Sequence, residues 1–119
     1  MTESIIMNKT YSFALRIIKA YKFLTEEKKE FILSKQMLRS GTSIGAMVRE
    51  SKFAQSKLDF INKLSIGLKE ANETLYWLEL LHDSGYIDEE VFLSIRSDCN
   101  EIVSILASIV KTSKQTLNS

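Results

Sequence analysis

The sequence predicts an all-α protein that folds as one up-down-up-down antiparallel four-helix bundle. Proline, which breaks helix interiors, is absent, and glycine occurs only four times. Neither Asn-Gly nor Asp-Gly, the dipeptides typical of tight β-hairpins, occurs in the chain. Apolar residues recur at spacings of three and four in four successive segments with short connections between them. Consecutive helices are therefore expected to be antiparallel neighbours.

The whole chain, residues 1–119, is expected to form a single domain with a polar tail from about residue 111. A chain of this length can bury a core without a metal or a disulfide. The hydrophobic fraction of 45% and the charged fraction of 26% are close to the globular average. The polar tail is expected to fray.

The first helix is predicted over about Asn8 to Leu24. Thr25 is expected to break it, ahead of the acidic pair at 26–27. The apolar residues of its expected core face are Tyr11, Ala14, Ile17, Ile18, Tyr21 and Leu24.

The second helix is predicted over about Glu27 to Phe53, and its inner face is narrow. Small residues keep its middle thin, and Gly41 and Gly45 are four residues apart. A glycine inside a helix costs about 1 kcal/mol relative to alanine. We interpret the pair as a close crossing with a neighbouring helix, and a flexible hinge is the alternative. The expected inner-face residues are Met37, Gly41, Ile44 and Val48.

The third helix is predicted to begin after Ser56, since Asp59 follows three residues later as in a capping box. It is expected to end near His82, where Gly85 can adopt the left-handed conformation that stops a helix. The apolar residues of its expected core face are Phe60, Leu64, Leu68, Ala71, Leu75 and Leu78.

The fourth helix is predicted to begin at Asp88, a favourable N-cap residue. Ile87 and Phe92 flank the cap at the spacing of a hydrophobic staple. Its expected core face consists of Phe92, Ile95, Cys99, Ile102, Leu106 and Ile109.

The third helix carries more apolar residues than one core requires. Ile66, Trp77 and Leu80 project roughly opposite its expected core face, beside Lys69 and Glu73. A tryptophan flanked by aliphatic residues on an outer surface is typical of an interface. We therefore predict self-association, and the alternative is that this helix is buried on more sides than a simple bundle requires.

The net charge of +1 is unevenly distributed along the chain. Residues 1–55 carry ten Lys and Arg against five Asp and Glu, whereas residues 56–119 carry six against ten. Lys35, Arg39 and Arg49 share one sector of the second helix. They are candidates for weak contact with RNA or DNA phosphates, or for contact with Glu70 and Glu73 of a neighbouring subunit. A solvated or salt-bridged face is a further alternative.

Residues suited to catalysis are few, and the chain is predicted not to be an enzyme. His82 is the only histidine, and Glu79-Leu80-Leu81-His82 has the Glu-x-x-His spacing of di-iron bundles without the second copy that such sites need. Cys99 lies in an apolar stripe, as a buried small side chain would. No catalytic residue, metal ligand, cofactor or small-molecule substrate is identified. A cryptic metal-dependent or hydrolytic bundle remains the remote alternative.

The chain is expected to act in the cytoplasm and not in a membrane. Met1-Thr2-Glu3-Ser4 lacks the basic start and apolar run of a signal peptide. The single cysteine suits a reducing compartment. No apolar stretch approaches the roughly 20 residues that a transmembrane helix needs.

Two segments resemble the bacterial 23S rRNA-intervening-sequence proteins, which are also labelled ribosomal proteins because of where their genes lie. The resemblance covers nearly the whole chain and is carried by the segments 34–46, SKQMLRSGTSIGA, and 69–78, KEANETLYWL, with Asp59-Phe60 ahead of the second. It implies a four-helix bundle, a ring-shaped homopentamer, and kinship with the accessory proteins of diversity-generating retroelements, which are basic and bind nucleic acid. This chain departs from those relatives in its near-neutral charge, and Met47 stands where many family members have asparagine.

Together these observations predict a non-enzymatic, ring-forming homo-oligomeric binding or scaffold protein, with an RNA or ribonucleoprotein partner as one possibility. A protein-binding adaptor with no role in nucleic-acid binding is the alternative.

Overall fold

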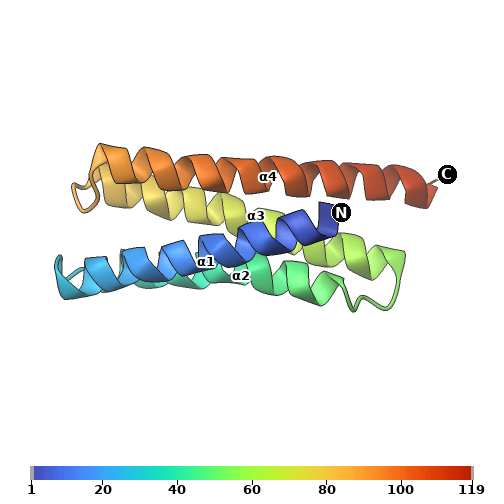
Figure 1. The fold of residues 1–119 in the computed structure, drawn as a ribbon, viewed down its shortest axis with the longest axis horizontal. Helices are drawn as coiled ribbons and strands as arrows, with labels where there is room; N and C mark the ends of the chain where they lie inside the picture. The colour runs from blue at the N-terminus through green and yellow to red at the C-terminus, as the bar shows by residue number, and fades with distance from the viewer. Residues whose placement is uncertain (1, 119) are drawn as a thin grey trace.

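The protein is a rod of four helices, seen in a computed structural model that describes residues 2–118 and the side chains of residues 5–117 (Figure 1). The rod measures 51 × 22 × 21 Å. Met1, in the N-terminal segment considered for a signal peptide, and Ser119, in the predicted polar tail, lie outside the described residues. No strand occurs within residues 2–118, so the predicted all-α class is confirmed. The helices are α1 (Thr2–Glu26), α2 (Leu33–Ser51), α3 (Lys57–Asp83) and α4 (Glu89–Asn118).

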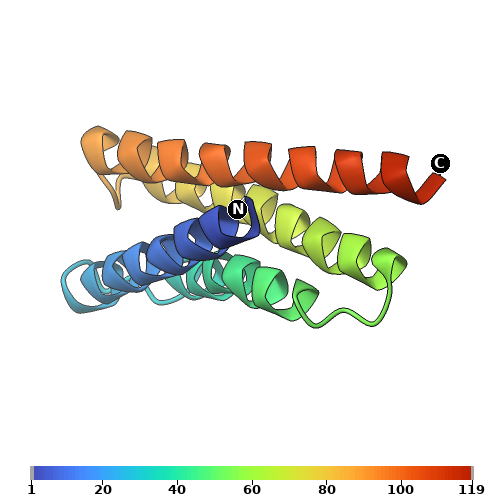
Figure 2. The same cartoon turned by 45° about the vertical axis from the view of Figure 1, so that its right-hand side comes forward.

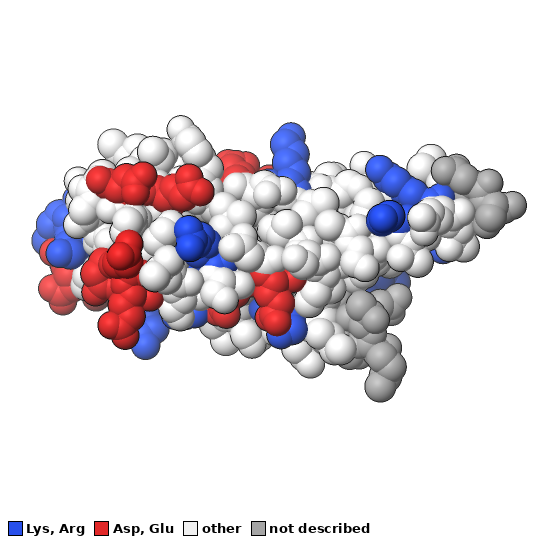
Figure 3. All heavy atoms as spheres, turned by 90° about the horizontal axis from the view of Figure 1, so that it is seen from above, with Lys and Arg blue, Asp and Glu red and all other residues white. Residues whose placement is uncertain are grey.

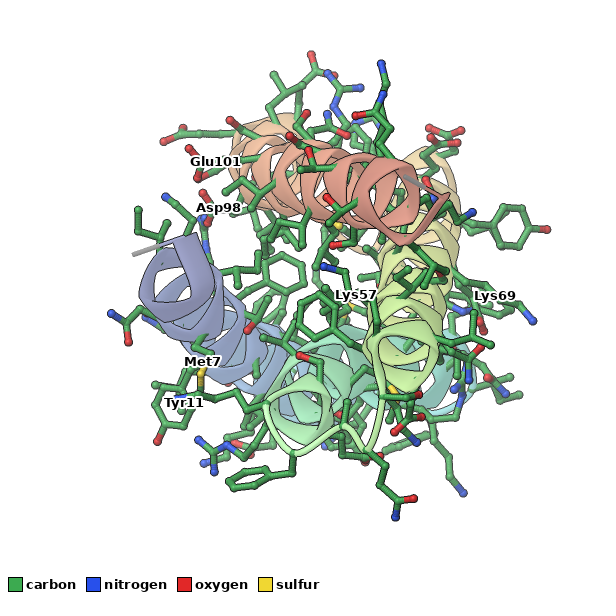
Figure 4. The ribbon with its side chains drawn as sticks, turned by 90° about the vertical axis from the view of Figure 1, so that its right-hand side faces the viewer. Met7, Tyr11, Lys57, Lys69, Asp98 and Glu101 are labelled. Atoms are coloured by element: carbon green, nitrogen blue, oxygen red, sulfur yellow. The ribbon has the colours of Figure 1, made fainter. Side chains whose placement is uncertain are left out.

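The helices run up, down, up and down around one core, in the predicted topology (Figures 1 and 4). Seen end-on, they occupy the corners of a square in chain order, so α1 also lies beside α4. Burying the large apolar side chains of this core drives folding, since each large aliphatic residue contributes about 1.5–3 kcal/mol to the free energy of unfolding. The largest side chains with almost no exposed surface include Ile6, Ile17, Leu24, Met37, Ile44, Leu64, Leu78, Leu81, Ile95, Ile102 and Leu106.

Helix α1 is longer than predicted and turns a different face to the core. It begins at Thr2, six residues before the predicted start at Asn8. Tyr11 and Ile18, expected inside, are 59% and 36% exposed. Apolar residues surround this helix, so periodicity alone did not decide which of them point inward. Among the α1 side chains that the structure describes, the buried ones are Ile6, Thr10, Phe13, Ile17 and Leu24.

The break between α1 and α2 lies after the predicted position and depends on Glu30. Thr25 remains inside α1, where its hydroxyl donates to the Tyr21 carbonyl at 3.0 Å. Lys29 adopts a positive φ of 55°, which ends the helical path. The Glu30 carboxylate then accepts backbone N–H bonds from residues 32, 33 and 34 at 3.2, 2.9 and 2.7 Å. Helix α2 therefore begins at Leu33 and not at Glu27.

Small residues of α2 allow its neighbours to approach closely, as predicted. An added Cβ at Gly41 would lie 2.9 Å from side-chain atoms of Ile17 on α1. On the α3 side, the hydroxyl of Thr74 donates to that of Ser40 at 2.8 Å, and both side chains are fully buried. The expected inner face is confirmed, because Met37, Gly41, Ile44 and Val48 are all buried.

The predicted ends of α3 and α4 are confirmed. The Ser56 hydroxyl accepts from the Asp59 amide at 3.0 Å, and the Asp59 carboxylate accepts from the Gln55 amide. Gly85 adopts φ +86° after α3 ends at Asp83. The Asp88 carboxylate caps α4 by accepting from the amide of residue 91 at 2.8 Å.

The core faces of α3 and α4 correspond closely to the predicted stripes. On α3, Leu64, Ala71 and Leu78 are buried, while Phe60, Leu68 and Leu75 are only partly buried. The α3 face is rotated toward positions 61, 67, 74 and 81. On α4, every predicted residue is buried except Ile109, which is partly buried.

Helix α4 continues through the segment predicted to fray. It extends to Asn118, and Ser113 within it is 8% exposed. None of the helices within residues 2–118 is both long and apolar enough to cross a membrane.

Candidate functional site

The three cations predicted as a contact surface lie on the outer face of α2, where all are exposed. At about 100° per residue, Arg39 lies on the side of that face toward α3, and Arg49 on the side toward α1. The structure accordingly gives them different surroundings, because Arg39 meets carboxylates of α3 and Arg49 borders a depression between α1 and α2. Around the helix axis, Lys35 lies between these two arginines.

Arg39 is held within its own chain by two carboxylates of α3. Its Nη1 lies 3.0 Å from Oε2 of Glu70, and its Nη2 donates to Oε1 of Glu73. The same Glu73 oxygen accepts from the Trp77 indole N–H at 3.2 Å. This differs from the alternative in which Glu70 and Glu73 of a neighbouring subunit meet the cations. The sequence could not reveal it, because the residues are 31 and 34 positions apart on different helices.

The network changes the proton affinity of both partners. Hydrogen bonding to Arg39 lowers the pKa of the Glu73 carboxyl below its ordinary value. The same bond raises the pKa of Arg39. Arg39 is therefore a charged clamp between α2 and α3, with less capacity for a phosphate than an isolated guanidinium.

Lys35 and Arg49 retain the capacity to meet an anion. Neither forms an ion pair with any side chain described between residues 5 and 117. Arg49 borders a shallow depression of about 290 Å³ between α1 and α2. The depression exists because residues with little or no side chain, Gly45 and Ala46, lie opposite Thr10 and Ala14.

Helix α1 presents an apolar surface on its exposed side, where Tyr11 and Ile18, both expected in the core, lie with Leu15. Tyr11 and Leu15 are 59% and 52% exposed, and Ile18 continues the row one turn further. We call these three residues the α1 patch. Tyr11 also lines the depression, and Figure 4 shows it beside Met7, directed away from the bundle axis. Spacings of four and three on one helix are the signal that could have indicated a second apolar face.

The outer face of α3 carries the three apolar residues predicted to form an interface, Ile66, Trp77 and Leu80. We call these three residues and Tyr76 the α3 patch. Ile66 is 37% exposed, whereas Trp77 and Leu80 are half-buried, and Trp77 packs partly against the core. Tyr76, not predicted, is 56% exposed and forms an edge-to-face pair with Trp77 at 5.1 Å. The end-on view places α3 across the bundle from α1, with Lys69 and Tyr11 on opposite sides (Figure 4).

Charge is segregated along the exposed face of α4. Viewed from above, acidic side chains gather in the half near the α3–α4 turn, with some cations among them, and the charged side chains toward the opposite end are cations (Figure 3). This is the order that complements a helix dipole, with Glu89 and Glu90 in the first turn. Lys111 and Lys114 lie near the other end of the helix.

The reactive residues occupy structural positions. Burial, reinforced by the nearby Asp98 carboxylate, raises the pKa of the Cys99 thiol to about 12, so the nucleophilic thiolate is scarce at neutral pH. Its Sγ lies 3.4 Å from the Ala71 carbonyl. The His82 ring stacks on Phe92 at 4.4 Å. Among the described residues, no group of three His, Cys, Asp or Glu side chains is placed to hold a metal ion.

Comparison with known proteins agrees with this architecture. Residues 2–108 match the family model of the 23S rRNA-intervening sequence protein. A solved structure from Bacteroides thetaiotaomicron, a protein of unknown function from the S23 ribosomal protein family, is 57% identical with a TM-score of 0.92. The match covers 93% of this chain and 99% of that one. No curated protein matches the chain. The chain therefore belongs to the 23S rRNA-intervening sequence protein family.

Proposed function

We propose that this chain is a non-enzymatic scaffold of the cytoplasm that works as a head-to-tail homo-oligomer. The observation that carries the proposal is the exposure of apolar side chains on two opposite sides of one bundle, the α1 patch and the α3 patch. Exposed apolar surfaces of this kind mark association sites in proteins. The α3 patch of one copy would rest against the α1 patch and the adjoining depression of the next.

Two different surfaces make a heterologous contact, which repeats until the rotation closes a ring. The pentamer implied by the family resemblance is one such closed ring. Gly45 and Ala46 supply the space for a protruding aromatic side chain, and Tyr76 projects from the opposite side of the bundle with 56% of its surface exposed. An aromatic residue inserted into a depression is the usual anchor of an interface.

Light scattering after size exclusion tests this proposal. Tyr11→Glu on the α1 patch and Ile66→Glu on the α3 patch should each reduce the oligomer to monomers, because each buries a charge in the contact. Leu93→Glu is the matched control, since Leu93 is 43% exposed on α4, outside both patches. This control should assemble like the parent protein.

Mixing the two variants separates a heterologous contact from a symmetric one. A Tyr11→Glu chain keeps an intact α3 patch, and an Ile66→Glu chain keeps an intact α1 patch. One intact contact can then form, so the mixture should yield a heterodimer and nothing larger. A parent protein that is monomeric at micromolar concentration, or variants that assemble unchanged, would refute the proposed contact.

An RNA or ribonucleoprotein partner is the second candidate, and Lys35 and Arg49 are the observation that favours it. With Arg39 engaged by two carboxylates, each subunit offers only these two cations from the predicted set. Binding should therefore be weak, largely independent of base sequence, and steeply salt-dependent, at a log–log slope near −0.7 for each single-strand phosphate contact.

Filter binding with single-stranded RNA tests this candidate. Lys35→Gln with Arg49→Gln should abolish binding and leave the oligomer intact, if the two cations meet phosphate. Loss of the oligomer instead would place these residues in the subunit contact. No difference from the parent in either assay would assign them to the solvated surface.

A further inference from the structure

A cleft of about 520 Å³ lies between the last turns of α1 and the first turns of α4. In Figures 1 and 2, α1 diverges from α4 toward the end where α1 finishes. The α3–α4 turn closes the same end of the cleft, where Gly85 and Tyr86 line it. This cleft is separate from the α1 and α3 patches, none of whose residues contribute to it.

The cleft exists because side chains connect α1 to α4 along only part of their length. Lys9 pairs with Glu101 at 2.7 Å, and Arg16 contacts Asp98 at 2.7 Å and Ser94 at 2.6 Å. Beyond Arg16, no hydrogen bond or ion pair joins described side chains of α1 and α4. The two helices therefore separate over the final turns of α1.

The deepest parts of the cleft lining are apolar. Ile95 is 2% exposed and Ile87 is 7% exposed, and Ala20 lies with them. Phe23 and Val91 also line the cleft, with 44% and 42% of their surfaces exposed. A flat apolar body lying between these two side chains would remove their surfaces from water, which is the main driving force for ligand binding in such clefts.

The charged lining is mostly cationic. Arg16, Lys19 and Lys28 contribute three positive charges, and Asp88 contributes one negative charge. The Asp88 carboxylate is already engaged in capping α4. Neither lysine forms an ion pair with a side chain described between residues 5 and 117, and the Lys28 ammonium lies 5.8 Å from the Phe23 ring centre. An occupant that complements this lining carries a negative charge next to an apolar body.

We propose that the α1–α4 cleft binds a small aromatic anion, with its ring system between Phe23 and Val91 and its acidic group between Lys19 and Lys28. The volume falls within the range of about 300–1,000 Å³ that small-molecule sites occupy. An inorganic anion would leave the apolar lining uncovered, so the aromatic body is part of the proposal. The anionic group can be a carboxylate, a sulfonate or a phosphate, which the same two ammonium groups recognise.

Titration with anilinonaphthalene sulfonate, an aromatic anion whose fluorescence rises in apolar surroundings, tests the proposal. We expect saturable binding of one dye per chain. Lys19→Gln with Lys28→Gln should weaken it about three- to tenfold, as the loss of two exposed ion pairs predicts. Lys22→Gln is the matched control, because Lys22 is exposed on the same helix but does not line the cleft. Raising the salt concentration should weaken binding in the parent and have less effect in the double variant.

Methyl-selective NMR spectra locate the dye. The Ile87 and Ile95 methyl signals should move with the ring current of the bound dye, while that of Ile66, on the α3 patch, should not. Tyr11→Glu should leave the affinity unchanged, so failure of the self-association proposal and failure of this one are distinguishable. The absence of saturable binding, equal affinity in the double-lysine variant, or shifts confined to Ile66 would overturn the proposal. An acidic peptide that binds here while the dye does not would likewise overturn it.

Discussion

The crossing of α1 and α2 at Gly41 offers a sharp test of the packing, because the same helix contains its own control. A Cβ added at Gly41 would lie 2.9 Å from both Cγ1 and Cγ2 of Ile17, closer than such contacts ordinarily come. Ile17 is fully buried and β-branched, so it cannot move aside cheaply. A Cβ at Gly45 would meet Thr10 Oγ1 at 3.4 Å, an ordinary contact.

The expected stabilities follow from two opposing effects. Replacing a helical glycine with alanine gains about 1 kcal/mol of helix propensity at either site. Overpacking at Gly41 costs about 1–3 kcal/mol, and no such cost arises at Gly45. The free energy of unfolding should therefore fall by between about 0 and 2 kcal/mol in Gly41→Ala, and it should rise by up to about 1 kcal/mol in Gly45→Ala. Because the propensity gain is common to both, the difference between the two variants measures the overpacking alone when both are made in the Ile66→Glu background, where the proposed contact at the depression beside Gly45 cannot form.

Denaturant unfolding followed by circular dichroism, at one protein concentration, measures this difference. Thermal unfolding should show it as roughly 4 °C for each kcal/mol. Gly41→Leu should lose more than Gly41→Ala, since the larger side chain displaces α2. In the double variant Gly41→Ala with Ile17→Ala, the loss in unfolding free energy should be smaller than the sum of the losses in the two single variants. The reason is that the new methyl group enters the space that the Ile17 side chain left. A Gly41→Ala protein as stable as Gly45→Ala would refute the close crossing.

Further predictions concern the buried polar and reactive residues. Glu30→Gln should lower the free energy of unfolding by about 1–2 kcal/mol near neutral pH, because an amide accepts hydrogen bonds more weakly than the carboxylate that caps α2. Burial acts to raise the Glu30 pKa, but the backbone N–H groups of residues 33, 34 and 32 outweigh it, so the pKa is lowered from 4.5. The stabilisation is therefore full above pH 4.5 and lost as the pH falls through the lower folded-state value. Cys99 should react with iodoacetamide far more slowly in the folded protein than in urea at pH 8, since burial keeps its thiol protonated with a pKa of about 12. His82→Ala should leave the oligomeric state unchanged in light scattering and cost about 1 kcal/mol through loss of the stack on Phe92.

Each of these predictions has an outcome that contradicts it. A stability difference between Glu30→Gln and the parent that persists unchanged well below pH 4.5 would mean that the carboxylate is not the cap. Equal alkylation rates in the folded and the unfolded protein would place Cys99 at the surface. A stoichiometric metal that disappears in His82→Ala would show that the ring is a ligand.

Features set by neighbouring residues could be predicted from the sequence. Ser56 with Asp59, Asp88 and Gly85 form their hydrogen bonds or backbone conformation within a few positions of the chain, so their chemistry determines the helix ends locally. The inner face of α2 was also predictable, because its apolar residues form a single narrow stripe.

Features that depend on other helices could not be predicted in this way. Apolar residues surround α1, and only packing against α2 and α4 determines that Phe13 is buried while Tyr11 is exposed. The contacts of Arg39 with Glu70 and Glu73 required the rotation of both helices, which sequence spacing does not give. Glu30 lay within a predicted helix, because nothing in the composition indicated that Lys29 would leave the helical path.

The order of the helices around the core also determines how this chain can fold. Each helix packs against the one that follows it, so the α1–α2, α2–α3 and α3–α4 pairs require only short loops to close. The α1–α4 pair is the exception, and its closure brings together segments from the two ends of the chain. Bundles dominated by such local pairs fold within microseconds to milliseconds. During synthesis the α1–α4 side is therefore the last that can close, because α4 is the last helix to leave the ribosome.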